Sequence, residues 1–201
     1  MEAIFYIIKT LISILVVIVP LFLIVAYVTY SERKIIGFMQ SRMGPMRVGP
    51  SGLLQPIADV LKLVSKEIII PTNANKGIFL TAPMLMLIPS LLVWSVIPLS
   101  EYFIISNINA GLLFILALTS LSVYGVILAG WASNSKYAFL GSMRSAAQII
   151  AYEIAMGFAL VGVLMLSGSL NLQNIIYAQS GSLFNWYWLP LFPLFLIYFI
   201  A

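Results

Sequence analysis

The stretch that decides the fold is residues 31–71, SERKIIGFMQSRMGPMRVGPSGLLQPIADVLKLVSKEIIIP. Seven of the ten Lys and Arg residues, and three of the six Asp and Glu residues, lie in it or within five residues of its end. The sequence on both sides of it is apolar. A charged segment of this length, marked by Gly and Pro, therefore has to lie in water, at the lipid headgroups or against another protein.

The composition of the whole chain is that of a polytopic membrane protein. The 201 residues are 62% hydrophobic and 8% charged, whereas soluble domains carry about 25% charged residues, so a water-soluble core is excluded. Cys and His are both absent, which removes disulfides, thiolate sites and the commonest metal ligand. We therefore expect this chain to hold no haem, zinc or iron–sulfur cluster of its own.

Long apolar runs predict an all-α polytopic membrane protein, a single membrane domain over residues 1–201 with about five transmembrane helices. Runs of about 20 residues cross the hydrocarbon at a rise of about 1.5 Å per residue. The last run stops without a polar flank, from which we expect a longer protein with a further C-terminal part. The predicted spans are residues 11–30, 78–99, 111–131, 142–166 and 186–201.

Between the first two spans, the sequence predicts an amphipathic helix over residues 52–68. Apolar and polar residues each recur there at i, i+4 and i+7, so each set forms one stripe of a helix. Pro56 suits the first turn, and Ser51 is placed to cap it. The segment is too short and too charged to span, so we expect it to lie in the membrane interface.

The distribution of Lys and Arg predicts the orientation. The loops after the first and third spans, with the residues beside them, hold nine of the ten basic residues, and the loops after the second and fourth spans hold none. Those two basic loops are therefore expected to face the cytoplasm or the mitochondrial matrix, with the N-terminus outside. No internal repeat is evident, which argues against a transporter built from inverted halves.

Glu153 is an acid deep inside a predicted span. A carboxylate in hydrocarbon is costly, so it has to face protein or water. It follows Arg144 by nine residues, which places it about 13 Å further along the helix and on the opposite face. Two interpretations stay open, a proton-relay carboxylate and a structural acid hydrogen-bonded to a neighbouring span. We favour the relay, because intramembrane ionisable residues are usually functional.

Small and hydroxyl-bearing residues predict close packing between the spans. In the third span, Thr119, Ser120 and Ser122 are expected to hydrogen-bond across helices. In the fourth span, alanine recurs every four residues and is expected to form a ridge that a second helix can approach closely. The ridge consists of Ala147, Ala151, Ala155 and Ala159.

The basic residues of the 31–71 segment support more than one interpretation. Glu32, Arg33 and Lys34 stand where the first span meets water, a place where charges often do no more than set topology. Arg42 and Arg47 flank a Gly-Pro turn, and two guanidiniums there are suited to a partner's carboxylate, a substrate carbonyl or a lipid phosphate. The segment thus has the composition expected of the mouth of a site for a lipid-soluble substrate and of a dock for a soluble partner.

Asp59 argues against a patch that binds only lipid, because an acid gains nothing from anionic headgroups. Lys62 and Lys66 share its stripe, so an ion-paired helix face of small energetic value stays open. The chain shows no nucleophile–base pair, phosphate-binding Gly loop or metal-ligand cluster. It also lacks a basic surface interleaved with aromatic residues, so no nucleic-acid partner is expected.

Two long motifs resemble one known family. ERKIIGFMQSRMGPMRVGPSGLLQPIADVLKLVSKE, residues 32–67, and GWASNSKYAFLGSMRSAAQIIAYEIAMG, residues 130–157, are similar to segments of a membrane-subunit family of NADH–quinone oxidoreductase, found in bacteria and called chain 1 in mitochondria. The resemblance implies a membrane-arm subunit of respiratory complex I, a proton-translocating enzyme of the bacterial plasma membrane or the mitochondrial inner membrane. Its partners would be the other membrane and peripheral subunits, together with membrane lipids.

The resemblance also implies roles for individual residues. The long loops would build the wall and entrance of a quinone chamber against peripheral subunits that hold the terminal iron–sulfur cluster. Quinone would be the substrate, while NADH, FMN and the clusters would belong to partner subunits. Arg144 and Glu153 would begin the path that couples quinone chemistry to proton pumping. The residues implied at the quinone site and the docking face are Glu32, Arg33, Arg42, Arg47, Asp59 and Lys62.

Two alternatives from other classes stay open at this point. A subunit of a membrane-bound hydrogenase shares the same loop, and its partner would carry nickel and ferredoxin-linked clusters. A stand-alone ion or solute transporter is disfavoured by the single deep acid, the missing repeat and the large charged loop.

Overall fold

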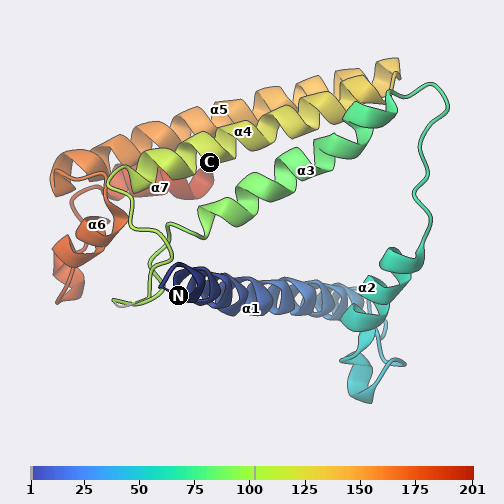
Figure 1. Ribbon diagram of the computed structural model, residues 1–201, viewed down its shortest axis with the longest axis horizontal. Coiled ribbons are helices and arrows are strands. Elements are labelled where there is room, and N and C mark those ends of the chain that lie inside the picture. Colours follow the sequence, from blue (N-terminus) through green and yellow to red (C-terminus); the bar gives the residue numbers. More distant parts are fainter. Residues whose placement is uncertain (1, 102) are drawn as a thin grey trace. The chain divides into compact units, whose positions relative to one another are not determined.

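The computed structural model describes residues 2–101 and 103–201, and the described residues form helices, turns and loops without a strand (Figure 1). The predicted all-α class is therefore confirmed. The chain divides into two compact units, Met1–Ile69 and Ile70–Ala201, each of which is described by itself.

Among the described residues, four helices are long and apolar enough to cross a membrane, which agrees with a multi-pass membrane protein. They are α1 (Glu2–Met39), α3 (Lys76–Val93), α4 (Gly111–Ala132) and α5 (Lys136–Ser167). The fifth predicted span, residues 186–201, contains α7 (Phe192–Ile200).

Several helix ends differ from the predicted ones for identifiable reasons. The first helix continues beyond residue 30 because Arg33 and Lys34 are good helix formers. The helix α3 ends at Val93, before Pro98, rather than at residue 99. The helix α5 starts before residue 142 and is closed by Gly168, whose φ of 63° is the left-handed conformation that ends many helices.

The first unit consists of α1, a folded loop with the short 3-10 helix η1 (Pro50–Gly52), and α2 (Gln55–Ser65). The helix α2 is the amphipathic helix, and Pro56 lies in its first turn as predicted. The prediction that Ser51 caps it is wrong: Leu54 holds the N-cap position, and Ser51 takes part in a tight turn with φ 55°. Gly52 has φ 81°, and a Cβ there would overlap the backbone of Pro45, so the turn requires glycine.

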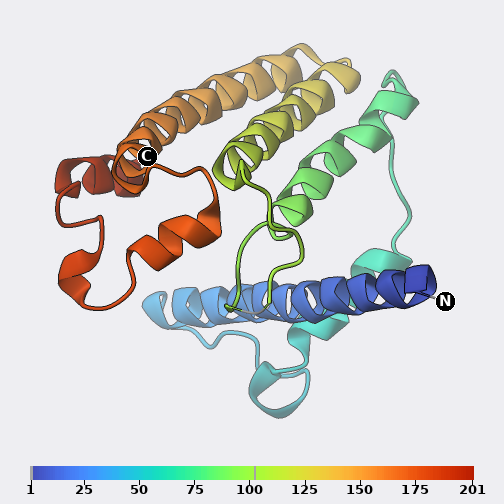
Figure 2. The same cartoon turned by 60° about the vertical axis from the view of Figure 1, so that its left-hand side comes forward.

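In the second unit, α3, α4 and α5 lie side by side in chain order, and α7 packs against α5 (Figure 2). The short α6 (Leu172–Ala178) follows the end of α5 in the chain. Glycine allows the close approach of these helices. A Cβ on Gly125 of α4 would come within 2.9 Å of the Ala82 carbonyl oxygen of α3, and a Cβ on Gly130 would overlap Ser142 of α5. The backbone amide of Asn75 donates to the Ala132 carbonyl at 2.9 Å and ties the start of α3 to the end of α4.

The predicted alanine ridge of α5 does not face one neighbouring helix. Ala159 is buried, whereas Ala147 and Ala151 are exposed on the described part of the chain. The reason is geometric: a four-residue step turns an α-helix by about 400°, so the row drifts by roughly 40° per step. The buried alanine near the start of α5 is instead Ala146.

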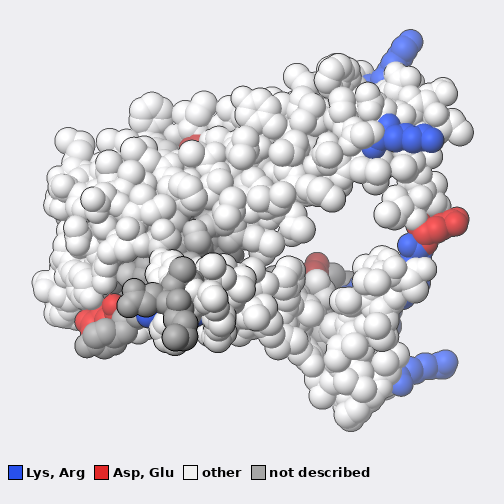
Figure 3. Space-filling model, in the orientation of Figure 1, with Lys and Arg blue, Asp and Glu red and all other residues white. Residues whose placement is uncertain are grey.

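The surface is mostly apolar, and the interior of each unit is small. Within the described residues, no large side chain is fully buried, and the buried side chains are mainly Ala, Val and Leu. Figure 3 shows that most of the face in view carries no Lys, Arg, Asp or Glu. Apolar area of this extent has to be covered by lipid or by other proteins.

Candidate functional site

Arg33 and Asp59, which the sequence analysis named separately, form an ion pair in the first unit. Arg33 Nη1 of α1 donates to Asp59 Oδ2 of α2 at 2.5 Å. Gln55 precedes Asp59 by one helical turn and donates through Nε2 to Asp59 Oδ1 at 3.0 Å. Both contacts, the one from Arg33 more than the one from Gln55, lower the pKa of the Asp59 carboxyl below its ordinary value. Asp59 is therefore an ionised, oriented acceptor at neutral pH.

The loop before α2 is tied to the same end of α1. The Tyr30 hydroxyl donates to the Ser51 carbonyl oxygen at 2.7 Å. Lys34 lies over the Tyr30 ring, with Nζ 5.6 Å from its centroid, and its Nζ is 3.1 Å from Met46 Sδ. A Cβ on Gly44 would lie 3.0 Å from the Lys34 Cα, so the turn packs directly against the helix. Residues 40–54 thus fold back along α1 and place α2 beside Arg33.

The other predicted residues of this region do not converge on one point. Arg42 is exposed, and its Nε donates to Gln40 Oε1 at 2.8 Å. Glu32 and Arg47 are exposed as well. Lys62 lies in the last turn of α2 and contributes only slightly to the lowered pKa of Asp59. In this described region, Arg33 and Asp59 form an ion pair, and the other charged side chains predicted at this site are exposed and available for contacts with other molecules.

Glu153 lies on the side of α5 that meets α4. Its Oε2 accepts a hydrogen bond from Ser120 Oγ of α4 at 3.1 Å, and the residue is half-buried. Arg144 is exposed on the same helix. The contact with Ser120 is the one expected of a structural acid, and it adds no second charge beside the carboxylate of an intramembrane acid, which is usually functional. Both interpretations of Glu153 therefore remain compatible with the geometry.

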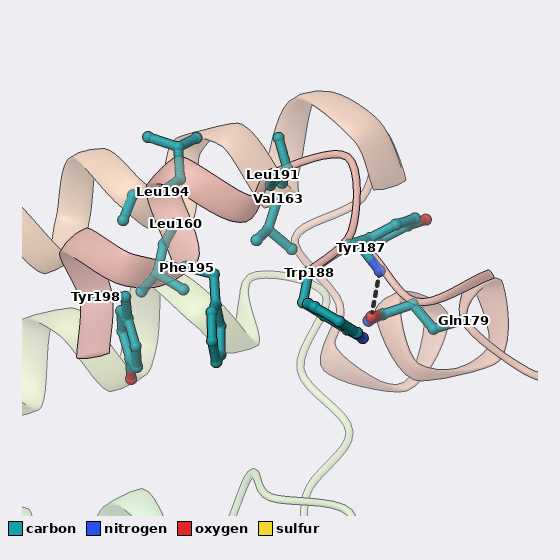
Figure 4. A pocket seen from close by; sticks show the side chains of 10 residues that line it. Leu160, Val163, Gln179, Tyr187, Trp188, Leu191, Leu194, Phe195 and Tyr198 are labelled. Atoms are coloured by element: carbon teal, nitrogen blue, oxygen red, sulfur yellow. Dashed lines mark hydrogen bonds between the residues drawn. The ribbon is translucent and has the colours of Figure 1, made fainter. Parts of the chain in front are cut away.

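A cavity of about 160 Å³ lies between α5 and the C-terminal segment. Figure 4 shows Tyr198 and Gln179 at its opposite ends, with Phe195 and Trp188 between them. The one amide side chain in its lining is already engaged, because Gln179 Oε1 accepts from the Tyr187 amide at 3.1 Å and Gln179 Nε2 donates to the Ile175 carbonyl. The lining is thus apolar in character, and the sequence analysis did not identify it.

A cluster of amide side chains joins the loops that precede α4 and α6. The buried Asn171 donates through Nδ2 to Asn107 Oδ1 at 2.7 Å and caps α6 by accepting from the Gln173 amide at 2.9 Å. Asn107 in turn donates to Gln173 Oε1 at 2.9 Å. The sequence analysis missed this cluster, although the recurrence of asparagine at positions 107, 109 and 171 in the two loops was the available signal.

The side chains of the described residues are poorly suited to metal binding. No group of three or more His, Cys, Asp or Glu lies close enough there to hold a metal ion. The described part of the chain offers instead oriented carboxylates, exposed cations and hydroxyls, which suit proton transfer and the binding of polar headgroups.

A protein-family model matches most of the chain. The family described as NADH dehydrogenase matches residues 12–201. The matched range includes both motifs quoted above, and it also includes Arg33, Asp59, Ser120 and Glu153.

Proposed function

This chain belongs to the NADH dehydrogenase family, and we propose that it forms part of a quinone-binding chamber and the start of the path that couples quinone reduction to proton translocation. The family and the spanning helices identify the chain as a multi-pass membrane subunit of a complex I-type, multi-subunit oxidoreductase. Quinone as substrate, and iron–sulfur clusters, FMN and NADH on partner subunits, are parts of the proposal.

The chemistry of quinone reduction agrees with this proposal. A quinone takes up two electrons and two protons to form a quinol. The proposal takes the electrons from partner subunits, because Cys and His, the usual ligands of iron–sulfur clusters and haem, are absent from these 201 residues. Protons can come from carboxylates with oriented hydrogen bonds, and general acid–base groups contribute about 10²–10⁴-fold to rates.

The residues of the first unit suit the headgroup and docking side of the chamber. The Arg33–Asp59 pair presents fixed charges at the end of α1, and Arg42 and Arg47 supply exposed guanidiniums. A guanidinium can donate to a quinone carbonyl or to a carboxylate of a neighbouring subunit. In this proposal Glu32 and Lys62 support that face, and the loop lies on the cytoplasmic or matrix side of the membrane.

The observation that carries the coupling part of the proposal is the position of Glu153. It lies within a spanning helix, half-buried, and the hydrogen bond found for it among the described residues comes from a neutral hydroxyl. Placing an acid inside the membrane costs free energy, and such residues usually have a function. Arg144, exposed nearer the start of α5, is placed at the entrance of the path in this proposal.

The test is Glu153→Gln in the intact complex, reconstituted into proteoliposomes. Glutamine keeps the shape and the ability to accept a hydrogen bond, but it does not carry a proton, so coupled quinone reduction and pumping should fall at least about tenfold. Glu101→Gln, which removes an exposed loop acid, is the matched control and should change neither. Wild-type pumping and turnover in Glu153→Gln would remove Glu153 from the mechanism.

A further inference from the structure

We propose that Ser120 is a positioning residue, whose hydroxyl holds the Glu153 carboxylate across the α4–α5 interface in one orientation for proton transfer. This inference rests on the proposed function of Glu153. The direct observation is the hydrogen bond from Ser120 Oγ to Glu153 Oε2 at 3.1 Å, which joins residues on two different spanning helices.

The behaviour of the neighbouring hydroxyls makes Ser120 distinct. Hydroxyl side chains inside helices commonly donate to a carbonyl of the preceding turn. Thr119 does so, with Oγ1 3.0 Å from the Leu116 carbonyl oxygen, and so does Ser122, with Oγ 2.6 Å from the Thr119 carbonyl oxygen. Of these three hydroxyls in one helical turn, two therefore donate to carbonyl groups of α4, and the hydroxyl of Ser120 donates to Glu153 on α5.

The packing of α4 on α5 sets this contact. Gly130 and Ser142 meet so closely near the connection between the helices that a Cβ on Gly130 would overlap the Ser142 side chain. Further along the same antiparallel interface, Ser120 meets Glu153. Because the helices are locked by that close approach, the Ser120 hydroxyl has a defined place from which to hold the carboxylate.

A hydroxyl suits a group that has to gain and lose a proton. Serine carries one donor and two acceptor lone pairs. Ser120 donates to the ionised carboxylate, and it can accept from the O–H of the protonated carboxyl. The contact can therefore persist in both protonation states with its direction reversed, and the side chain of Glu153 stays in place as the proton moves.

No cation of the described residues performs this task. The ion pair found in the described part of the chain is Arg33–Asp59, in the other unit. Arg144 is nine residues before Glu153 on the same helix, about 13 Å along the axis. Ser120 is exposed and Glu153 is half-buried on the surface of this chain, so a proton donor or acceptor on water or on another subunit can reach the pair.

The experiment compares Ser120→Thr with Ser120→Val in the intact complex. The two variants have nearly the same shape, but only threonine keeps a hydroxyl. We expect threonine to retain at least about half of the coupled turnover, and valine to lower it about fivefold and to reduce the number of protons moved per quinone reduced. Misplacing a reacting group by about 1 Å can cost up to 10²-fold, so an effect of this size is realistic.

Ser122→Thr and Ser122→Val form the matched control pair, because Ser122 donates to its own helix. The two control variants should have equal turnover and equal proton stoichiometry. The amount of assembled complex is measured for all four variants, and rates are expressed per complex, so that a loss of folding is not counted as a loss of coupling.

Glu153→Gln in the same preparation separates the two levels of the proposal. If it leaves pumping unchanged, the proposed coupling function of Glu153 fails, and the role of Ser120 fails with it. If it lowers pumping while Ser120→Thr and Ser120→Val behave alike, the proposed function stands and the role of Ser120 is overturned. The double variant Ser120→Val/Glu153→Gln should be no slower than Glu153→Gln alone, because the hydroxyl acts only through the carboxylate.

Discussion

Asp59 and Glu153 are both carboxylates held by hydrogen bonds, but their surroundings are opposite. Asp59, in the charged segment of the first unit, accepts hydrogen bonds from the Arg33 guanidinium and the Gln55 side-chain amide. These contacts lower the pKa of its carboxyl. Glu153, inside a spanning helix of the second unit, accepts a hydrogen bond from the neutral hydroxyl of Ser120. Near water a carboxylate can be paired with a cation at little cost. Between membrane helices, a neutral partner avoids placing a second charge in hydrocarbon.

The two units also differ in the kind of contact that holds their elements together. In the first unit, side-chain contacts such as Tyr30 to Ser51 and Arg33 to Asp59 tie the loop and α2 to the end of α1. In the second unit, α3, α4 and α5 approach closely at glycine and alanine. Contacts near water are individually weak, whereas overlap in a packed interface is costly. This difference ranks the expected effects of substitutions.

The largest effect is expected at the α3–α4 interface. In Gly125→Ala the new methyl group would lie 2.9 Å from the Ala82 carbonyl oxygen and would overlap Met86, so the helices have to separate. We expect a loss of about 1–3 kcal/mol, measured as a lower melting temperature of the intact complex in detergent. The control is Gly141→Ala, whose Cβ would meet nothing within 4 Å in this chain. Equal melting of the two variants would contradict the close-packing account.

A smaller loss is expected in the amide cluster of the second unit. Asn171→Ala removes both the cap of α6 and the donor to Asn107, and Asn171 is buried. Loss of a cap and of a buried hydrogen bond together cost about 1–2 kcal/mol. Asn174→Ala is the control, since Asn174 is exposed and its Nδ2 makes a longer bond of 3.3 Å to Ser169. In the same melting experiment, wild type and Asn174→Ala should have similar melting temperatures, and Asn171→Ala should have a lower one.

The smallest effect is expected at the exposed ion pair of the first unit. Arg33→Ala should speed hydrogen exchange of the α2 amides by about two- to fivefold, because an exposed pair contributes little. Asp59→Asn should give a similar increase, whereas Lys66→Ala, which removes an exposed cation just after α2, should give none. Exchange rates unchanged in Arg33→Ala would show that the pair does not hold α2.

The pH dependence of this effect follows from the lowered pKa of Asp59. A group whose folded pKa is depressed stabilises the fold fully above its unfolded pKa, about 3.9 for aspartate, and this stabilisation is lost as the pH falls through the folded pKa. The increase caused by Arg33→Ala should therefore be the same at about pH 6 and about pH 8. A difference between these two values would point to a different titrating group.

Part of the site could be predicted from the sequence, because the signal was local. Glu153 stands out as an acid in an apolar run, and the charged residues around Asp59 fall in one polar segment. Their partners were not predictable in the same way. Arg33 and Asp59 are 26 residues apart, and Ser120 and Glu153 are 33 apart. From the sequence we predict hydrogen bonds across helices for Thr119, Ser120 and Ser122. In the structure only Ser120, of these three, makes such a bond, and the other two hydroxyls donate to their own helix.

Hydrophobicity and charge act on each residue where it stands, so the sequence by itself determined the helical class, the apolar spans, the amphipathic α2 and the position of the deep acid. The turn at Ser51, the drift of the alanine row and the choice of Ser120 as the partner of Glu153 were decided only by the tertiary structure. Each of these depends on how a loop returns or how two helices are rotated against each other. That rotation is set by close contacts between distant residues, such as Gly130 with Ser142, and no local pattern records it.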